Sequence, residues 1–188
     1  SRTRAAQRRP AGAAAPEAAS DETPQSARPQ VLVTGAAGTL ARHVIRRLKN
    51  DYNVIAVDFR YAARLGPRVP SYKLDVTRRG FEDVFRKHDI KGIIHIGRIG
   101  AESSRESRYN ANVLGSRRMF DLALAYGVSK VVVLSTFFVY GASPYNPALL
   151  DESSPLKASN LTRDLVDSVE LENLANIYLW RYPELNMT

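Results

Sequence analysis

Short apolar runs alternate with amphipathic segments between residues 30 and 188. The apolar runs predict five strands, at residues 30–35, 53–58, 71–76, 91–97 and 130–136. The other segments space their apolar residues at three or four positions and predict helices at residues 39–51, 79–89, 104–126 and 162–182. This alternation predicts an α/β fold, a doubly wound parallel sheet of the Rossmann type with helices on both faces.

The helical spacing also predicts which side chains face the sheet. The expected inward positions are Leu40, Val44, Ile45 and Leu48 in the first helix, and Phe81, Val84 and Phe85 in the second. Near the start of the last helix, Asp167 and Ser168 are expected to be exposed.

The two ends of the chain differ from this alternating region. Residues 1–29 contain no large apolar residue, so we expect a disordered tail or linker. Their Arg and Ala content is similar to that of an organelle transit peptide, whereas three acidic residues within them favour a linker. Residues 30–188 are expected to form one domain. The sequence stops at PELNMT, where another strand would begin, so a C-terminal substrate lobe is expected to be absent.

Composition argues against several classes of protein. No apolar run approaches the roughly 18 residues that cross a bilayer, so we expect no membrane partner. The chain has no Cys, which excludes disulfides and agrees with a cytoplasmic location, with organelle import as the alternative. Its three His are far apart in sequence, so no metal site is expected. The net charge of +8 is carried by scattered Arg residues, which favours a solvated surface over a nucleic-acid interface.

The first predicted strand ends in a turn of small residues, TGAAGTLA at residues 34–41, that opens the first helix. Gly35 would allow the tight turn, Gly38 the close approach of a ligand, and Ala41 close packing of helix on strand. Backbone N–H groups at a helix start can bind a pyrophosphate. The expected dinucleotide contacts are Gly35, Ala37, Gly38, Thr39 and Leu40. A glycine turn that binds nothing is the alternative.

Asp58 ends the second predicted strand, where a carboxylate can accept hydrogen bonds from the ribose hydroxyls of an adenine dinucleotide. The same carboxylate would repel a 2′-phosphate, so Asp58 favours NAD over NADP. Arg60 lies two residues further on and could reverse that preference. A strand-end turn residue is the alternative for Asp58. Residues 30–188 are therefore expected to be an NAD(P)-binding domain, with NAD as the cofactor.

Five further motifs follow the glycine turn in order. They are Asp75 with Val76, GIIHIG at residues 92–97, NVLG at 112–115, LSTFFVYG at 134–141 and DESSPL at 151–156. Together with TGAAGTLA, they resemble the extended short-chain dehydrogenase/reductase family, and within it the NAD-dependent epimerase/dehydratase branch. The resemblance covers residues 30–188. It implies that Asp75 and Val76 contact adenine, that Gly97 lies beside the cofactor, and that Asn112 belongs to the family's helix motif.

The same resemblance implies a Ser or Thr in the active site, a Tyr that acts as general acid/base, and a Lys one helical turn later. The Lys is needed because an unperturbed Tyr titrates near 10, and a nearby cation favours its ionised form. Thr136 takes the Ser/Thr role, but Asp164 stands at the Tyr position and Ser168 at the Lys position. Thr136 and Asp164 are therefore the candidate catalytic residues. A strand-end hydroxyl and a helix cap are their respective alternatives.

Other residues do not restore the missing pair. Tyr126 and Lys130 have the required separation, but the helix is predicted to end between them, so they need not share a face. Tyr140 is expected to pack against the core, and nothing places Lys157. Arg98 stands where the family has a second small residue. It could contact a cofactor phosphate or a substrate carboxylate, or it could face the solvent.

Three functions stay open at this point. The chain could be an atypical NAD-binding oxidoreductase or isomerase that acts on a nucleotide sugar or similar substrate. It could be a catalytically inactive module that binds a dinucleotide for a regulatory or structural role. It could be a scaffold that has lost the cofactor, although the retained glycine turn and Asp58 argue against this. A homodimer through the helices at residues 104–126 and 162–182 is also expected.

Overall fold

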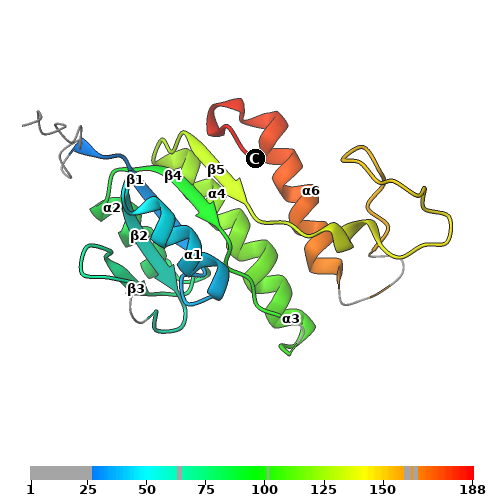
Figure 1. Cartoon of the computed structure of the whole chain (residues 1–188), viewed down its shortest axis with the longest axis horizontal. Helices are drawn as coiled ribbons and strands as arrows, with labels where there is room; N and C mark the ends of the chain where they lie inside the picture. Colours follow the sequence, from blue (N-terminus) through cyan, green and yellow to red (C-terminus); the bar gives the residue numbers. More distant parts are fainter. Residues whose placement is uncertain (1–26, 63–64, 101, 159–161, 163–164) are drawn as a thin grey trace, which may run out of the picture.

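The computed structural model describes residues 27–62, 65–100, 102–158, 162 and 165–188. Residues 1–26 of the predicted tail and the candidate catalytic Asp164 lie outside the described residues. Five parallel strands form one sheet in the order β3-β2-β1-β4-β5 (Figure 1). The strands are β1 (Gln30–Thr34), β2 (Asn53–Asp58), β3 (Ser71–Lys73), β4 (Ile90–His95) and β5 (Lys130–Val133). The predicted parallel α/β fold is confirmed.

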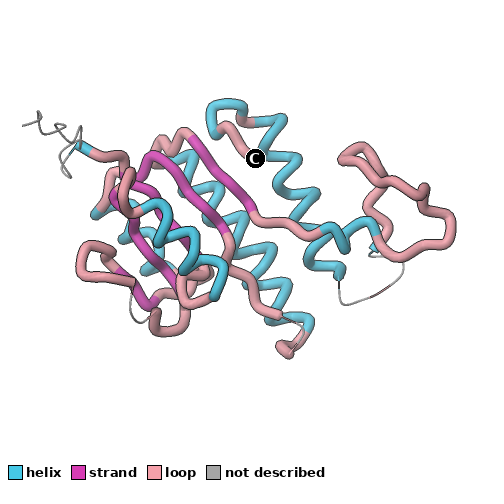
Figure 2. The backbone as a smooth tube through the Cα atoms, in the orientation of Figure 1, coloured by secondary structure: helices cyan, strands magenta, loops and turns pink. Residues whose placement is uncertain are grey.

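Helices cover both faces of this sheet, with α1 on one face and α2 and α4 on the other (Figures 1 and 2). The first half of the fold contains α1 (Thr39–Leu48), the 3-10 turn η2 (Arg79–Phe81) and α2 (Glu82–Lys87). The long predicted helix at residues 104–126 is one helical run in three parts: α3 (Arg105–Arg108), the π-helical η3 (Tyr109–Leu114) and α4 (Gly115–Ala125). The C-terminal part contains η4 (Phe137–Tyr140), α6 (Val166–Arg181) and η6 (Pro183–Leu185).

Two apolar cores lie on opposite faces of the sheet, because successive residues of a strand point to opposite faces. Leu32 of β1 belongs to the larger core, which also contains Phe81, Phe120 and Leu171 from the helical elements on that face. Val33, the next residue of β1, belongs to the smaller core under α1. Both cores have fully buried members, so apolar side chains are packed on each face of the sheet.

The inward positions of the second predicted helix are confirmed, since Phe81, Val84 and Phe85 are all buried. In the first helix Ile45 is buried, but the predicted inward position of Leu40 is wrong, since this residue is 49% exposed. Leu40 lies in the first turn of α1, beyond the edge of the sheet, and borders a hollow instead of the core. Apolar periodicity alone could not show where the sheet beneath the helix ends.

The end of the chain returns to the sheet. Met187 forms a parallel bridge with Val131 of β5. The Val133 N–H donates to the Thr188 carbonyl at 2.8 Å, and the Thr188 N–H donates to the Val131 carbonyl at 2.9 Å. The last two residues are therefore hydrogen-bonded along the edge of β5 in the parallel direction.

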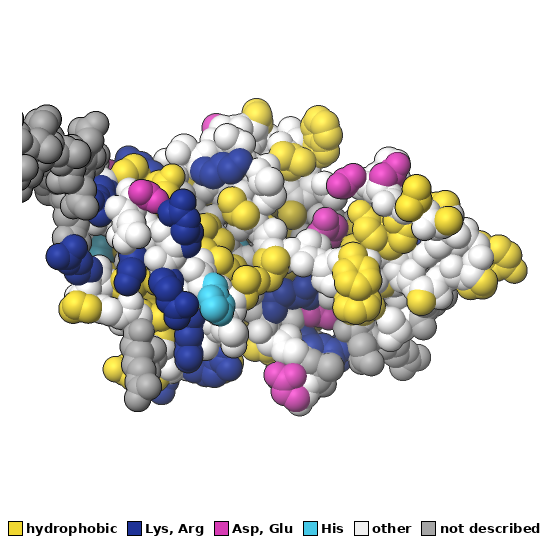
Figure 3. All heavy atoms as spheres, in the orientation of Figure 1, with side chains coloured by type: hydrophobic (Ala, Val, Ile, Leu, Met, Phe, Trp, Pro, Cys, Tyr) yellow, Lys and Arg dark blue, Asp and Glu magenta, His cyan; other side chains and the backbone are white. Residues whose placement is uncertain are grey.

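The surface differs between the two ends of the molecule. Basic side chains are prominent over the end that carries α1, whose last turn contains Arg46 and Arg47 (Figure 3). Large apolar side chains are exposed at the other end, among them Phe137, Tyr145 and Leu149. Within the described parts of the chain, no helix is long and apolar enough to cross a membrane.

Candidate functional site

A hollow of about 890 Å³ lies at the carboxyl edge of the sheet, where β1, β2 and β4 end. The strand order reverses between β1 and β4, and open α/β sheets bind their ligands at such a switch point. The predicted cofactor residues that line this hollow are Gly35, Gly38, Thr39, Leu40, Asp58, Asp75, Val76, Gly97 and Asn112. The fold thus brings together residues that span almost eighty positions of sequence. Thr136 is not part of the lining.

The glycine turn packs directly against Gly97, two residues after the end of β4. Gly35 has a φ of +71°, a left-handed conformation that favours glycine. A Cβ on Gly35 would lie 2.5 Å from the Gly97 Cα, and a Cβ on Gly97 would lie 2.9 Å from the Gly35 nitrogen. Within the described part of the chain, no side chain caps the N-terminus of α1 at Gly38. The N–H groups of the first turn of α1 are therefore open to an anion in the hollow.

Asp58 braces this turn from the end of β2. Its carboxylate accepts hydrogen bonds from the Ala37 N–H at 2.9 Å and from the Arg60 N–H at 2.8 Å. The Arg60 guanidinium adds an ion pair at 3.4 Å. Ala37 is thus placed behind the turn and holds Asp58, while the Arg60 side chain is directed to Asp58 and balances its charge.

Two of the sequence motifs meet at the far side of the hollow. Asp75 accepts hydrogen bonds from the Thr77 N–H at 2.8 Å and the Thr77 hydroxyl at 2.7 Å. This turn follows β3, which ends at Lys73 and not at residue 76. A Cβ on Gly115 would lie 2.8 Å from the Val76 side chain. Val76 therefore packs against α4 at Gly115, the last residue of NVLG, where a larger residue would clash with it.

A buried chain of hydrogen bonds runs from β4 into the helical layer and determines the protonation of His95. The Ser116 hydroxyl donates to the Asn112 carbonyl at 2.6 Å, so its oxygen accepts from His95 Nε2 at 2.7 Å. His95 Nδ1 therefore carries no hydrogen and accepts from the Thr34 hydroxyl at 2.7 Å. Burial, and secondarily the charge of Arg98, lowers the pKa of His95 to about 4. His95 is thus neutral at physiological pH.

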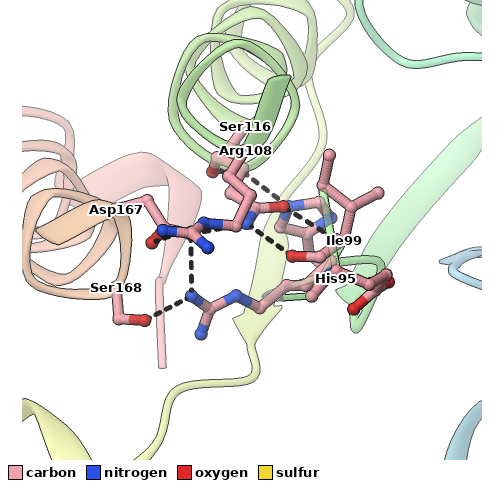
Figure 4. Close-up of polar contacts among 10 residues, drawn as sticks. His95, Ile99, Arg108, Ser116, Asp167 and Ser168 are labelled. Atoms are coloured by element: carbon pink, nitrogen blue, oxygen red, sulfur yellow. Dashed lines mark hydrogen bonds and ion pairs between the residues drawn. The ribbon is translucent and has the colours of Figure 1, made fainter. Parts of the chain in front are cut away.

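The Asn112 side chain joins three elements below the hollow. Its Oδ1 accepts from the Ile99 N–H at 2.9 Å, and its Nδ2 donates to the Ile99 carbonyl at 3.0 Å. The second hydrogen on Nδ2 reaches Asp167 of α6 at 2.6 Å. Figure 4 shows Asp167 on α6 facing the helix that carries Ser116, with Ile99 between them and the sheet. Asn112 lies in the π-helical segment, a feature that often marks functional sites.

The predicted exposure of Asp167 and Ser168 is wrong, since their relative exposures are 7% and 5%. Asp167 and Ser168 lie together on α6 (Figure 4), and Arg98 extends to both of them from the loop after β4. Arg98 Nη2 donates to the Ser168 hydroxyl at 2.6 Å and lies 3.5 Å from the Asp167 carboxylate. Arg108 approaches the same carboxylate at 3.8 Å. The loop, α3 and α6 are therefore joined by one buried polar cluster.

Of the two candidate catalytic residues, the structure describes Thr136, whereas Asp164 lies outside the described residues. Thr136 precedes η4, and its hydroxyl accepts a 3.4 Å hydrogen bond from the Phe138 N–H. Tyr126 and Lys130 are directed to different partners, Glu82 and the C-terminal residues respectively, so they do not form a pair. Tyr140 packs beside a small apolar cluster, as predicted.

Sequence reasoning missed the polar cluster around Asp167 and the buried role of His95. The only sequence signal for His95 was a polar residue within an otherwise apolar strand. No sequence signal connected Arg98 with Ser168, which lie 70 positions apart. Among the residues that the structure describes, no group of three or more His, Asp or Glu could hold a metal ion.

The fold and the site define a class of protein: a Rossmann-type α/β protein whose glycine turn borders a large hollow at the switch point of the sheet. The model of the NAD dependent epimerase/dehydratase family matches residues 31–161. The chain belongs to the NAD dependent epimerase/dehydratase family. The family indicated by the sequence motifs is thereby confirmed.

Relatives in this family are longer than the chain. UDP-glucose 4-epimerase from Bos taurus is 30% identical over 148 residues, which cover 67% of this chain and 42% of that protein. The Drosophila melanogaster enzyme of the same name is 32% identical over 141 residues, or 63% of this chain and 40% of that protein. The chain thus spans less than half the length of these relatives.

Solved structures agree with this assignment. UDP-glucose 4-epimerase from Thermus thermophilus, in complex with NAD, has a TM-score of 0.72 at 24% identity and covers 84% of this chain and 53% of its own. MoeE5 in complex with UDP-glucose and NAD has a TM-score of 0.71 at 26% identity, with coverages of 85% and 52%. The likeness to the Thermus thermophilus structure is one of fold.

Proposed function

We propose that this chain binds NAD in the hollow at the carboxyl edge of its sheet. The close approach of Gly35 and Gly97 carries this proposal, because neither residue places a side chain of its own at the point where β1 and β4 diverge. The N–H groups at the start of α1 would bind the pyrophosphate. Asp75 and Val76 would contact adenine, and Gly97 and Asn112 would border the nicotinamide half. Bound NAD would supply a hydride acceptor for an alcohol carbon.

Asp58 supports NAD over NADP as the cofactor. Its carboxylate lines the hollow and already accepts two backbone N–H groups, so its charge is fixed in place. A ribose hydroxyl can still donate to this carboxylate, whereas a 2′-phosphate would bring two further negative charges against it. The Arg60 guanidinium pairs with Asp58 and is thereby drawn away from a phosphate.

Isothermal titration calorimetry with NAD and NADP tests this proposal directly. We expect NAD to bind and NADP to bind at least tenfold more weakly. A like-charge contact at about 4 Å costs between about 1 kcal/mol in bulk water and about 4 kcal/mol near a protein surface, and about 1.4 kcal/mol corresponds to tenfold. Equal binding of both would remove the role given to Asp58. No binding of either would contradict the proposed cofactor site.

We further propose that the substrate, if the chain turns one over, is a nucleotide sugar or a similar alcohol. UDP-glucose is bound by the similar MoeE5 structure, and the relatives from Bos taurus and Drosophila melanogaster carry the name UDP-glucose 4-epimerase. The NAD-loaded chain would be incubated with UDP-glucose and UDP-galactose, and sugar interconversion would be followed by chromatography. Product formation at a rate proportional to protein concentration would support an atypical enzyme.

A catalytically inactive dinucleotide-binding module is the second candidate function, and the buried Ser168 favours it. This position has a hydroxyl where the family resemblance leads one to expect a Lys, and that hydroxyl is occupied by Arg98 at 2.6 Å. No turnover with either sugar, together with normal NAD binding, would support this function. The two candidates thus share the cofactor site and differ in one measurement.

We also propose that the chain forms a homodimer through α6 and the helical run at residues 104–126. Trp180 of this helix is 83% exposed, and Ile177 nearby is also exposed. Large apolar side chains on one helix are enriched at interfaces between subunits. Analytical ultracentrifugation should find a dimer that Trp180→Glu converts to monomer. A monomeric wild-type chain at high micromolar concentration would contradict the proposal.

A further inference from the structure

Arg98 is held rigidly at the switch point of the sheet by the residues on either side of it. On one side, Gly97 packs against Gly35, and its N–H donates to the Thr34 hydroxyl at 3.2 Å. On the other side, both backbone groups of Ile99 bind the Asn112 amide, at 2.9 and 3.0 Å. The backbone of Arg98 is therefore fixed relative to the glycine turn before any ligand binds.

The Arg98 side chain is also held, at one end of its guanidinium only. Nη2 donates to Ser168 at 2.6 Å and pairs with Asp167 at 3.5 Å. Among the described residues, Nε and Nη1 of Arg98 have no hydrogen-bond partner in the protein, although Arg98 lines the hollow. The side chain is 22% exposed, so these N–H groups are only partly solvated.

A partly buried guanidinium with unused donors is a good binding group for an anion. Its planar N–H edges match two oxygen atoms of a carboxylate or phosphate, and the partial loss of solvent strengthens the contact. Because Ser168 and Asp167 already restrict the side chain, little rotamer entropy is lost when a ligand binds. The charge that Arg98 places here also acts on its buried neighbour, where it contributes to the lowered pKa of His95.

We propose that Arg98 is a ligand-binding residue of the hollow, whose guanidinium, braced by Ser168 and Asp167 of α6, binds an anionic group of the bound molecule. This inference rests on the proposed dinucleotide site, since both use the same hollow. The anionic group is a carboxylate on the sugar of a nucleotide sugar or a phosphate of the cofactor or substrate. The shared chemistry is two oxygen atoms against the Nε and Nη1 edge of Arg98.

The experiment compares Arg98→Gln with the wild-type chain by calorimetric titration of NAD, UDP-glucose and UDP-glucuronate. The two UDP-sugars differ only in a carboxylate that replaces a hydroxymethyl group, so their difference isolates the carboxylate. Arg46→Gln, which removes one positive charge from exposed α1 outside the hollow, is the matched control. Thermal melting of each variant confirms that it is folded. Arg98→Lys, which keeps the charge but loses the planar fork, replaces Arg98→Gln if the latter does not fold.

Two results would support the proposal and identify the source of the anion. If the wild type prefers UDP-glucuronate by tenfold or more, and Arg98→Gln or Arg98→Lys loses this preference with unchanged NAD binding, the anion is a sugar carboxylate. If the variant instead weakens NAD, or weakens both UDP-sugars equally, by roughly tenfold, the anion is a phosphate of the cofactor or of the UDP group respectively. Arg46→Gln should match the wild type in each titration.

Other results would overturn it, and they are separable from failure of the proposed function. Suppose that the wild type binds NAD and that the Arg98 variant binds all three ligands within twofold of the wild type. This result would overturn the role of Arg98 and leave the NAD site intact. If the wild type binds no NAD, the proposed function fails. The titrations with the UDP-sugars then decide the role of Arg98. Binding by the wild type that the Arg98 variant weakens supports this inference. Equal binding by both proteins, or no binding by the wild type, overturns it.

Discussion

Replacement of Gly35 by Ala tests whether the contact between the glycine turn and β4 creates the cofactor site. The chain contains a natural control, because Gly127 has almost the same positive φ, +67° against +71° for Gly35. A Cβ on Gly127 would meet no atom within 4 Å, whereas a Cβ on Gly35 would lie 2.5 Å from the Gly97 Cα. The pair of variants therefore separates backbone strain from the loss of close packing.

The expected costs differ accordingly. A non-glycine residue in the left-handed region costs about 1–2 kcal/mol, which is the full cost expected for Gly127→Ala. In Gly35→Ala, the ends of β1 and β4 must also separate by about 1 Å to relieve the clash, and such overpacking adds about 1–3 kcal/mol. We expect Gly35→Ala to be less stable by about 2–5 kcal/mol in total. At about 2–4 °C per kcal/mol for a domain of this size, its Tm should fall clearly below that of Gly127→Ala.

Urea unfolding gives the two free energies, and calorimetry with NAD gives the binding. Gly127→Ala should bind NAD as the wild type does, because Gly127 ends α4 away from the hollow. Folded Gly35→Ala should bind NAD at least tenfold more weakly, because the displaced turn no longer presents its N–H groups to the pyrophosphate. Equal destabilisation of both variants, or wild-type NAD binding by Gly35→Ala, would refute the reasoning from close packing.

Three further predictions follow from the buried polar groups. His95 has a pKa of about 4 in the folded chain and about 6.5 when unfolded, so the native state binds fewer protons between these values. The contribution of neutral His95 to the free energy of unfolding is complete above pH 6.5 and is lost as the pH falls towards 4. Urea unfolding at neutral and at acidic pH measures this loss of folding free energy, which is about 3 kcal/mol at most for His95. The fall in stability with pH should be smaller in His95→Gln than in the wild type, and an identical fall in both would contradict the neutral state assigned to His95. Asp167→Ala should cost about 3–5 kcal/mol, measured by urea unfolding, because it leaves Arg98 without its buried counter-ion, whereas Glu170→Ala on the exposed side of α6 should change little. Ser168→Lys should lower the Tm because it places a second cation against Arg98, and addition of Arg98→Gly should restore part of the loss; additive effects of the two changes would show that these residues are not coupled.

The element order was predictable because it depends on local patterns. The apolar run of a strand and the apolar repeat of a helix each depend on residues within one short segment. The bounds of β2, for example, agree with the prediction at both ends. The glycine turn was predictable for the same reason, since it requires a positive φ at Gly35 and an adjoining helix start. The end of β3 was predicted three residues too late, at residue 76 instead of Lys73. The backbone turns after this strand, where the Asp75 side chain accepts a hydrogen bond from the Thr77 N–H.

The direction of the Arg98 side chain could not be predicted from any local pattern. The sequence left a cofactor phosphate, a substrate carboxylate and the solvent open, and the structure directs Nη2 of this side chain to Ser168, 70 positions away. The exposure of Asp167 was predicted wrongly for a related reason. A carboxylate is expected to be exposed to water unless the fold supplies partners for it, and here Asn112 and Arg98 are those partners. A charged group can be buried only where partners compensate its desolvation.

The sequence by itself thus determined the sheet, its helices, the glycine turn and the family. Only the tertiary structure decided which polar residues of α6 face inward, and it determined that His95 is neutral and that Arg98 borders the hollow. The physical reason is that hydrophobic periodicity and backbone conformation are properties of neighbouring residues. Burial, charge pairing and the remaining donors of a guanidinium depend instead on segments that become neighbours only after folding.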